Sequence, residues 1–338
     1  MPLERISPYM LSPVSTNGAN AAANAYIVYN SSTGRVEWSQ TETVVVISGY
    51  TSGGNDFPGT VTNVIDKFPF ATDGNASDVG DLTQARNFVA GQSSNTHGYT
   101  SGGGISAPTQ VNTIDRFPFA SNANATDVGD LSQTRNAPAG QSSSTSGYTS
   151  GGYTLDPLAT YRNTIDKFPF TTNANATDVG DLTVARSRTA GQNSSSSGYT
   201  SGGLSSTPAN VNTIDKFPFA SNANATDVGD LSEIRRLSTG QSSSTSGYTS
   251  GGFIPTNVSV NTIDRFPFAV DSSATDVGDL TAARWGPAGQ SSSASGYTSG
   301  GAPGAVNIID KFPFASNTNA SDVGDLTVAR AGPSGQQG

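Results

Sequence analysis

Gly49-Tyr50-Thr51-Ser52-Gly53-Gly54 is the first of six copies of one hexapeptide, and these copies set the organisation of the chain. The spacings between successive copies are 49, 49, 51, 49 and 49 residues, with the tyrosines at Tyr50, Tyr99, Tyr148, Tyr199, Tyr248 and Tyr297. A fixed period of this length is typical of repeat architectures, in which each unit is one supersecondary structure. The sequence therefore predicts six structural repeats.

Each repeat contains four strand-sized segments. In order they are Gly-Gln-Ser-Ser-Ser, the hexapeptide, Ile-Asp-Lys/Arg-Phe-Pro-Phe, and Asp-Val-Gly-Asp-Leu with its flank. In the third segment Ile214 and Lys216 share one face of the strand, and Asp215 and Phe217 share the other. We expect the aromatic residues to fill the space between neighbouring sheets. Pro218 cannot donate a ladder hydrogen bond, so we expect either that the pairing ends at it or that its nitrogen faces away from the neighbouring strand.

The first segment of each repeat consists of small polar residues, as in residues 140–144. Small side chains suit the axis of a β-propeller, where the inner strands of all blades converge. The segment after Arg330 aligns with a first strand, so we expect residues 330–338 to complete the blade that begins at Thr43 and to remove an exposed sheet edge. The predicted fold is all-β: a six-bladed propeller of four-stranded blades over residues 42–338, preceded by an N-terminal arm at 1–41.

The order of these features resembles the kelch repeat. In that repeat an arginine near the end of one blade is followed by a strand of small residues and then by an aromatic residue and a double glycine. The corresponding residues here are Arg186, Gly191-Gln192 and the segment Tyr199 to Gly203, and equivalents recur from residue 49 to 338. The tryptophan that often precedes the kelch arginine is absent, so Val179 or Leu182 must fill its volume. The resemblance implies a kelch-like propeller.

Composition restricts the function classes. Only 34% of residues are hydrophobic and 13% charged, which favours short strands over long helices. The formal net charge of −9 and the lack of a Lys/Arg cluster argue against a nucleic-acid partner. No cysteine is present, no apolar stretch approaches 18 residues, and the first residues lack the apolar run of a signal peptide. We expect no membrane insertion and no cofactor.

The connections between strands differ among repeats on one face only. The second-to-third connections, such as 153–162, and the fourth-to-first connections, such as 236–238, vary, whereas the opposite connections repeat almost unchanged. Variable loops on a uniform scaffold are typical of a recognition surface, although surface loops also drift when nothing selects them. The candidate ligand-binding residues are the aromatic residues and arginines of this face: Phe57, Phe88, Tyr153, Tyr161, Arg162, Arg188, Arg236, Phe253 and Trp285.

Catalytic and metal-binding patterns are weak. Asp-Val-Gly-Asp, as at residues 127–130, has oxygen-rich spacing that could bind Ca²⁺, but we favour aspartates that cap turns and pair with the recurring arginine. Asn-Ala-Ser/Thr, as at Asn124, is interpreted as turn chemistry rather than a glycosylation site. Catalytic residues usually break a repeat, and here the acidic positions are nearly uniform. We therefore expect no metal site and no enzymatic activity.

The N-terminal arm precedes the repeats. Residues 25–29 and 35–38 are predicted to form a hairpin, and an ordered role for the arm requires a partner. A cysteine-free chain of uniform Gly/Ser/Asn-rich repeats behind a short arm resembles virion proteins of tailed phages, especially those of marine cyanobacteria. The resemblance implies a tail, fibre or capsid-decorating protein on the virion surface. Its partners would be other virion proteins through residues 1–41 and a host glycan or protein, and a homo-oligomer is compatible with this interpretation. The alternative is a free carbohydrate- or protein-binding propeller of a bacterium.

Overall fold

The computed structural model describes residues 25–30, 35–40, 48–56, 59–106, 109–155, 160–206, 209–304 and 306–338. Within these ranges the regular structure is entirely strand, and no helix is long and apolar enough to cross a membrane. Strands β1 (Ala25–Asn30) and β2 (Arg35–Gln40) form the antiparallel hairpin that the sequence predicts. The hairpin belongs to a unit separate from the repeats, which form the second unit.

The repeats form six four-stranded antiparallel sheets, so the predicted six-bladed β-propeller is confirmed. From the inner to the outer strand, blade 1 consists of β33 (Ser334–Gln337), β3 (Ser48–Ser52), β4 (Val64–Pro69) and β5 (Ser77–Asp81); blade 2 of β6 (Ala90–Ser93), β7 (His97–Ser101), β10 (Thr113–Pro118) and β11 (Thr126–Asp130); and blade 3 of β12 (Ala139–Ser142), β13 (Ser146–Ser150), β16 (Thr164–Pro169) and β17 (Thr177–Asp181). Blade 4 consists of β19 (Ala190–Asn193), β20 (Ser197–Ser201), β23 (Thr213–Pro218) and β24 (Thr226–Asp230); blade 5 of β25 (Thr239–Ser242), β26 (Ser246–Ser250), β27 (Thr262–Pro267) and β28 (Thr275–Asp279); and blade 6 of β29 (Ala288–Ser291), β30 (Ser295–Ser299), β31 (Ile308–Pro313) and β32 (Ser321–Asp325).

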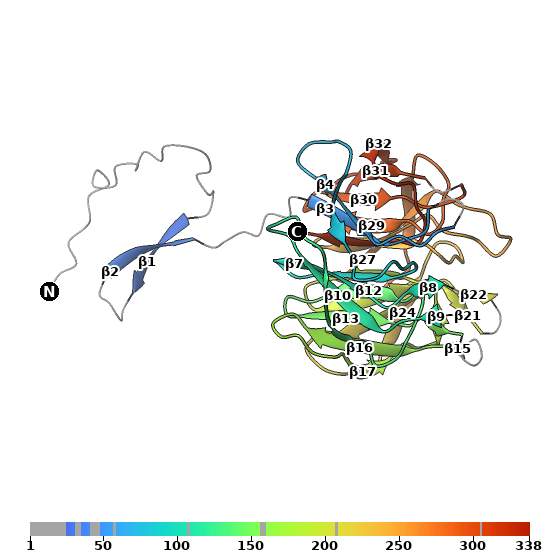
Figure 1. The fold of residues 1–338 in the computed structure, drawn as a ribbon, viewed down its shortest axis with the longest axis horizontal. Helices are drawn as coiled ribbons and strands as arrows, with labels where there is room; N and C mark the ends of the chain where they lie inside the picture. The colour runs from blue at the N-terminus through green and yellow to red at the C-terminus, as the bar shows by residue number, and fades with distance from the viewer. Residues whose placement is uncertain are drawn as a thin grey trace. The chain divides into compact units, whose positions relative to one another are not determined.

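Blade 1 combines strands from both ends of the repeat region. Strand β33 pairs antiparallel with β3, in the register Gly49↔Gln337 to Ser52↔Ser334. In Figure 1 the blue strands β3 and β4 lie beside the orange and red strands of blade 6. Their contact is apolar, because Phe68 of blade 1 packs in one cluster with Tyr297 and Ile309 of blade 6. The ring of blades is therefore closed by tertiary contacts at the point where the repeat region starts and ends.

The third strand of each blade packs on both neighbouring blades, as its alternation predicts. In β23, Phe217 lies in a cluster with Tyr148 of blade 3, and Ile214 lies in a cluster with Phe266 of blade 5. Leu182 completes the first of these clusters and Val179 is partly buried against it, so both residues proposed to replace the tryptophan contribute. The hydrophobic core is thus divided into six equivalent clusters between blades.

The inner strands approach one another so closely that their glycines have no room for a side chain. A Cβ atom on Gly140 would lie 2.2 Å from the carbonyl oxygen of Gly91 in the preceding blade. The glutamine that follows each such glycine links neighbouring blades. For example, Gln192 Nε2 donates to the Tyr248 carbonyl at 3.0 Å and to Thr249 Oγ1 at 2.8 Å. The predicted axis of small residues is present, and side-chain amides join its inner strands.

The recurring arginine pairs with a different aspartate from the one predicted. Arg186, which follows blade 3, pairs with Asp215 of the third strand of blade 4 at 3.2 Å, and not with an aspartate of Asp-Val-Gly-Asp. Thr183 donates from both its backbone N–H and its Oγ1 to the same carboxylate. The ion pair crosses a blade boundary, where the buried carboxylate needs several donors. The same pairing recurs at the other five boundaries: Arg86–Asp115, Arg135–Asp166, Arg235–Asp264, Arg284–Asp310 and Arg330–Asp66.

Candidate functional site

The two sets of variable connections meet on one face of the propeller, which we call the variable face. Each fourth-to-first connection forms an antiparallel bridge with the second-to-third connection of the next blade, as Arg236 does with Phe253 and Asn136 with Tyr153. In blades 2, 3 and 4 the second-to-third connections also contain pairs of short strands: β8 (Gly104–Ser106) with β9 (Thr109–Gln110), β14 (Tyr153–Thr154) with β15 (Thr160–Tyr161), and β21 (Leu204–Ser205) with β22 (Ala209–Asn210). Strand β21 also pairs with β18 (Arg186–Ser187), which lies in the fourth-to-first connection before blade 4. The variable loops therefore support one another.

A closed ring of backbone hydrogen bonds surrounds the axis on the variable face. Each of six residues, one per fourth-to-first connection, donates its N–H to the carbonyl of its predecessor in the ring at 2.7–2.8 Å. The donors are Phe88, Ala137, Arg188, Leu237, Gly286 and Gly332. All six have positive φ, between 48° and 69°. For the four that are not glycine this conformation costs on the order of 1–2 kcal/mol each, and the ring geometry enforces it.

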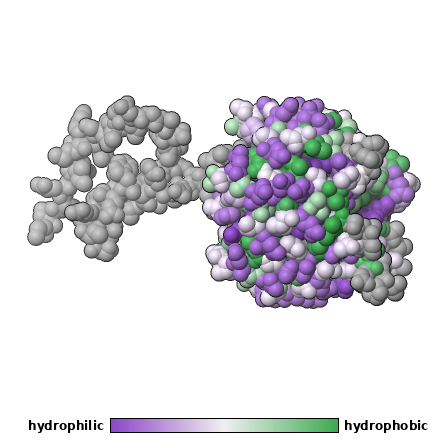
Figure 2. Space-filling view, viewed as in Figure 1, coloured by the Kyte–Doolittle hydropathy of each residue, from purple (hydrophilic) through white to green (hydrophobic). Residues whose placement is uncertain are grey.

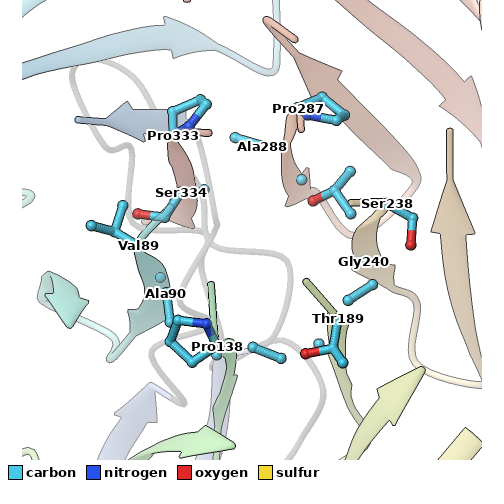
Figure 3. A pocket seen from close by; sticks show the side chains of 18 of the residues that line it. Val89, Ala90, Pro138, Thr189, Ser238, Gly240, Pro287, Ala288, Pro333 and Ser334 are labelled. Carbon is cyan, nitrogen blue, oxygen red and sulfur yellow. The ribbon is translucent and has the colours of Figure 1, made fainter. Parts of the chain in front are cut away.

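The ring forms one end of a cavity of ≈ 130 Å³ along the axis. Figure 3 shows small side chains from the six inner strands and their preceding loops arranged around an opening, among them Val89, Pro138, Thr189, Ser238 and Pro287. The lining is mainly small residues and backbone. This axial cavity offers little for the recognition of a chemically distinctive ligand.

A second pocket of ≈ 180 Å³ lies against the ring, and we call it the arginine pocket. It shares four ring residues with the axial cavity and is otherwise lined by aromatic and polar side chains of the variable loops. Its lining residues are Phe88, Asn136, Ala137, Tyr153, Arg188, Arg236, Leu237, Phe253 and Trp285. Six of the nine candidate residues from the sequence, namely Phe88, Tyr153, Arg188, Arg236, Phe253 and Trp285, thus come together in one pocket.

Two aromatic rings and two guanidinium groups dominate this pocket. Phe253 and Trp285 stack with ring centroids 5.1 Å apart and an interplanar angle of 25°. The guanidinium carbon of Arg236 lies 5.6 Å from the Phe253 ring, and that of Arg188 lies 5.9 Å from the Tyr153 ring. Burial, followed by the neighbouring charge of Arg188, lowers the pKa of Arg236 from its ordinary value. The pocket is therefore walled mainly by flat apolar surface, and two guanidinium groups lie beside its aromatic rings.

The other three candidate residues lie apart from this pocket. Tyr161 pairs with Tyr153 across β14 and β15, and their ring centroids lie 6.4 Å apart. Arg162 donates to Thr154 Oγ1 at 3.1 Å within the same loop. Phe57 lies outside the described residues. Of these three, Tyr161 and Arg162 therefore stabilise the loop that presents Tyr153.

A shallow groove of ≈ 480 Å³ continues from the arginine pocket across the loops of blades 1 to 3. Phe88, Asn136 and Tyr153 line both spaces. Beyond them the groove is lined by amides, hydroxyls and small apolar residues: Asn55, Gly59, Thr60, Val61, Asn87, Gly104, Ile105, Thr109, Gln110 and Leu155. In Figure 2 hydrophobic residues form small separate patches in a mainly hydrophilic surface. The amides and hydroxyls among the groove residues can hydrogen-bond an elongated polar ligand.

Buried polar atoms without a partner are concentrated on the variable face. Apart from atoms of the six boundary arginines, the buried unpartnered side-chain atoms among the described residues all belong to variable loops. They are Asn136 Oδ1, Arg162 Nε, Ser187 Oγ, Thr189 Oγ1, Asn210 Nδ2, Arg236 Nε and Ser238 Oγ. Buried polar groups in folded proteins nearly always have a partner. Of these residues, Asn136 and Arg236 line the arginine pocket, so a molecule bound there can supply partners to two of the atoms.

The opposite face uses its repeated residues for structure. Asp127 Oδ1 accepts the N–H of Gly129 within the outer strand β11, so Asp-Val-Gly-Asp forms an irregular strand and not the capped turn that the sequence favours. Asn175 Oδ1 accepts the N–H of Asp130 in the preceding blade at 3.0 Å, so an asparagine of the Asn-Ala-Thr motif joins two blades. Within the described residues no three His, Cys, Asp or Glu side chains are grouped as a metal site would require. The uniformity of this face follows from these inter-blade bonds.

Sequence comparison of the repeats does not single out Asn136 or Leu237 as pocket residues. Both stand in the variable connections, but neither is aromatic or charged, and their contribution depends on the ring geometry. The only signal for that geometry is glycine at two of the six ring positions, Gly286 and Gly332, which is compatible with positive φ.

The fold and this face define the class of the protein: a six-bladed β-propeller with a uniform scaffold and a variable, arginine- and aromatic-lined face. No known family model matches the chain, and a comparison with curated proteins found no similar sequence.

Proposed function

We propose that this chain is a non-enzymatic binding module that displays its variable face on the surface of a phage virion. The observation that carries the binding role is the arginine pocket, where six residues from different loops converge beside unpartnered buried polar atoms. Residues of this kind, in desolvated and partly enclosed positions, dominate the energetics of protein recognition sites. The six equivalent boundaries give the loops a rigid support.

The sequence supports the virion setting and a kelch-type ancestry. Near-identical Gly/Ser/Asn-rich repeats behind a short arm resemble tailed-phage virion proteins, and the recurring arginine and double glycine resemble kelch repeats. In this proposal residues 1–41 attach the chain to other virion proteins, and the variable face contacts a host glycan or protein. The same face would serve a free bacterial binding propeller, which would not need the arm.

Particle incorporation and host attachment test the two parts of this proposal separately. Deletion of residues 1–41 should remove the chain from purified particles. A full chain with Arg188→Gln and Trp285→Ala should still be incorporated, but its particles should attach less well to host cells. Incorporation without residues 1–41 would contradict the attachment role of the arm. Unchanged attachment of particles that carry the pocket variant would contradict the binding role of the face.

A further inference from the structure

We propose that the arginine pocket binds a carboxylate-bearing sugar residue of an acidic glycan, and that the adjoining groove holds the next sugar units. This inference rests on the proposed binding function and names the ligand class of the same face. In this arrangement Arg188 and Arg236 bind the carboxylate, the Phe253 and Trp285 platform contacts the apolar face of the sugar ring, and Asn136 accepts from a hydroxyl.

The guanidinium groups at the pocket carry positive charge that an anionic ligand would compensate. Within the described ranges neither Arg188 nor Arg236 forms an ion pair, whereas each of the six boundary arginines has a buried aspartate. Arg236 donates to the amide oxygens of Asn210 and Asn257, which leave its charge uncompensated. Two neighbouring guanidinium groups without a carboxylate, in a chain of net charge −9, form a site complementary to a carboxylate.

The rest of the pocket matches a ring that has both apolar and hydroxylated sides. Phe253 and Trp285 are only partly buried, so their stacked pair presents flat apolar surface. Asn136 is 6% exposed, and its Oδ1 has no partner although it lines both the pocket and the groove. An unpartnered buried acceptor of this kind is satisfied by a donor such as a sugar hydroxyl.

A glycan fits these observations better than an acidic peptide. A peptide that binds by adding a strand is held mainly through its backbone, and it needs free N–H and C=O groups along a strand edge. Around the axis those groups are already paired in the closed ring from Phe88 to Gly332. The groove instead offers side-chain amides and hydroxyls, including Asn55, Asn87 and Gln110, which suit a polyhydroxylated chain.

Binding of oligouronates to the full chain tests the inference. The probes are oligouronates and the same oligosaccharides after reduction of each carboxyl group to an alcohol, so that only the charge and its oxygen atoms differ. We expect the acidic form to bind, its affinity to fall with added salt, and the reduced form to bind at least tenfold more weakly, since hydrogen bonds to a charged group are worth that factor or more.

Two variants and a control locate the site. Arg188→Gln should weaken oligouronate binding about tenfold while leaving the Arg236 bonds to Asn210 and Asn257 in place. The separate variant Asn136→Asp should weaken binding more, because it places a second negative charge beside the carboxylate of the ligand. The control is the double variant Arg116→Gln, Arg265→Gln. The guanidinium groups of these two arginines contact the connections between the third and fourth strands on the opposite face, so this variant should bind oligouronates as the parent does.

Each contrary result overturns a defined part of the argument. Equal binding of acidic and reduced forms would overturn the carboxylate assignment while the face remains a glycan-binding surface. Binding of polyglutamate but of no oligouronate would assign the pocket to an acidic peptide. If the parent binds none of these probes, the inference fails, and the attachment of particles with the pocket variant still decides the proposed function independently.

Discussion

At the scale of single residues, the most demanding feature is the fully buried ion pair at each blade boundary. Asp215 accepts from Arg186, from the Thr183 N–H at 2.9 Å and from the Thr183 hydroxyl at 2.7 Å. The same guanidinium donates to the Thr200 carbonyl at 2.9 Å. Burial lowers the pKa of Arg186, and the charge of Asp215 opposes that shift. Arg186 Nε and Nη1 have no partner, so the burial of both charges depends on the ion pair itself and on the donors that the Asp215 carboxylate receives.

Replacing Arg186 should lower the free energy of unfolding far more than replacing an exposed cation does. Arg186→Met leaves Asp215 buried without its counter-ion, and we expect a loss of about 3–5 kcal/mol in the free energy of unfolding by urea titration. The matched control is Lys216→Met, which breaks the exposed pair with Asp271 and should cost less than about 1 kcal/mol. Equal shifts of the two urea midpoints would show that the boundary pair does not stabilise the fold.

The sequence indicates the arginine but not its partner. Two aspartates precede each arginine by a few positions in Asp-Val-Gly-Asp, and proximity in sequence favours them. The true partner of Arg135 is Asp166, in the next blade. Only the stacking of one blade on the next brings these residues together, and no local pattern encodes that distance. The positive φ of Ala137 and Leu237 likewise depends on ring closure and not on residue type.

At the scale of the elements, β33 is the strand on which closure depends. It completes the four strands of blade 1, and it also reaches blade 2, where Gln336 Nε2 donates to the Tyr99 carbonyl at 3.0 Å. A Cβ atom on Gly335 would lie 2.0 Å from the Gly289 carbonyl oxygen, which shows how closely β33 also approaches blade 6. Four residues therefore hold three blades together.

Removal of this strand should open the ring. Deletion of residues 331–338 exposes the edge of β3 and leaves the Tyr99 carbonyl without its donor, so we expect a sharp fall in the melting temperature measured by calorimetry. A circular permutant that starts at residue 331, joins residue 338 to residue 48 through a turn of about two residues and ends at residue 330 keeps every strand of the propeller and should melt near the parent. A deletion variant as stable as the parent would contradict closure by β33.

The strands themselves were largely predictable, since six copies of each segment average out local ambiguity. The alternation of Ile214 and Phe217 correctly assigns them to opposite faces of the strand, and the strand ends at Pro218 as expected. The pocket was predicted only in part. Aromatic and charged residues of the variable loops could be recognised, but the way the ring arranges them could not.

At the scale of the whole molecule, the blades are held by six equivalent aromatic clusters. In each, a tyrosine of one blade packs with two phenylalanines of the next; Tyr50 stacks on Phe119 at 4.8 Å and lies 5.5 Å from Phe117. Burial raises the pKa of Tyr50 to about 12 and also raises that of Tyr99, Tyr199, Tyr248 and Tyr297. Loss of the phenolic protons would therefore affect most blade boundaries at once.

Alkaline pH should consequently unfold the ring cooperatively. The folded state holds the Tyr50 proton more tightly than the unfolded chain, whose tyrosine pKa is near 10.0. This contribution to stability is complete below about pH 10 and is lost as the pH rises through about 12. Tyrosine absorbance and circular dichroism should change together in this window, and Tyr50→Phe should reduce the loss. Full ionisation of the tyrosines at pH 10 with an intact fold would contradict this account.

Loops of neighbouring blades pair with one another, and this pairing affects how such a protein can evolve. Arg236 and Phe253 meet on the variable face and also belong to one uninterrupted stretch of sequence, whereas the residues that hold the blades together are alike at every boundary. Recombination between two copies of the gene segment that encodes Asp-Val-Gly-Asp-Leu would move such a stretch intact to another blade position. The residues at the blade boundaries are the same there. The blades are thus interchangeable cassettes, and new surfaces can arise by shuffling them without rebuilding the scaffold.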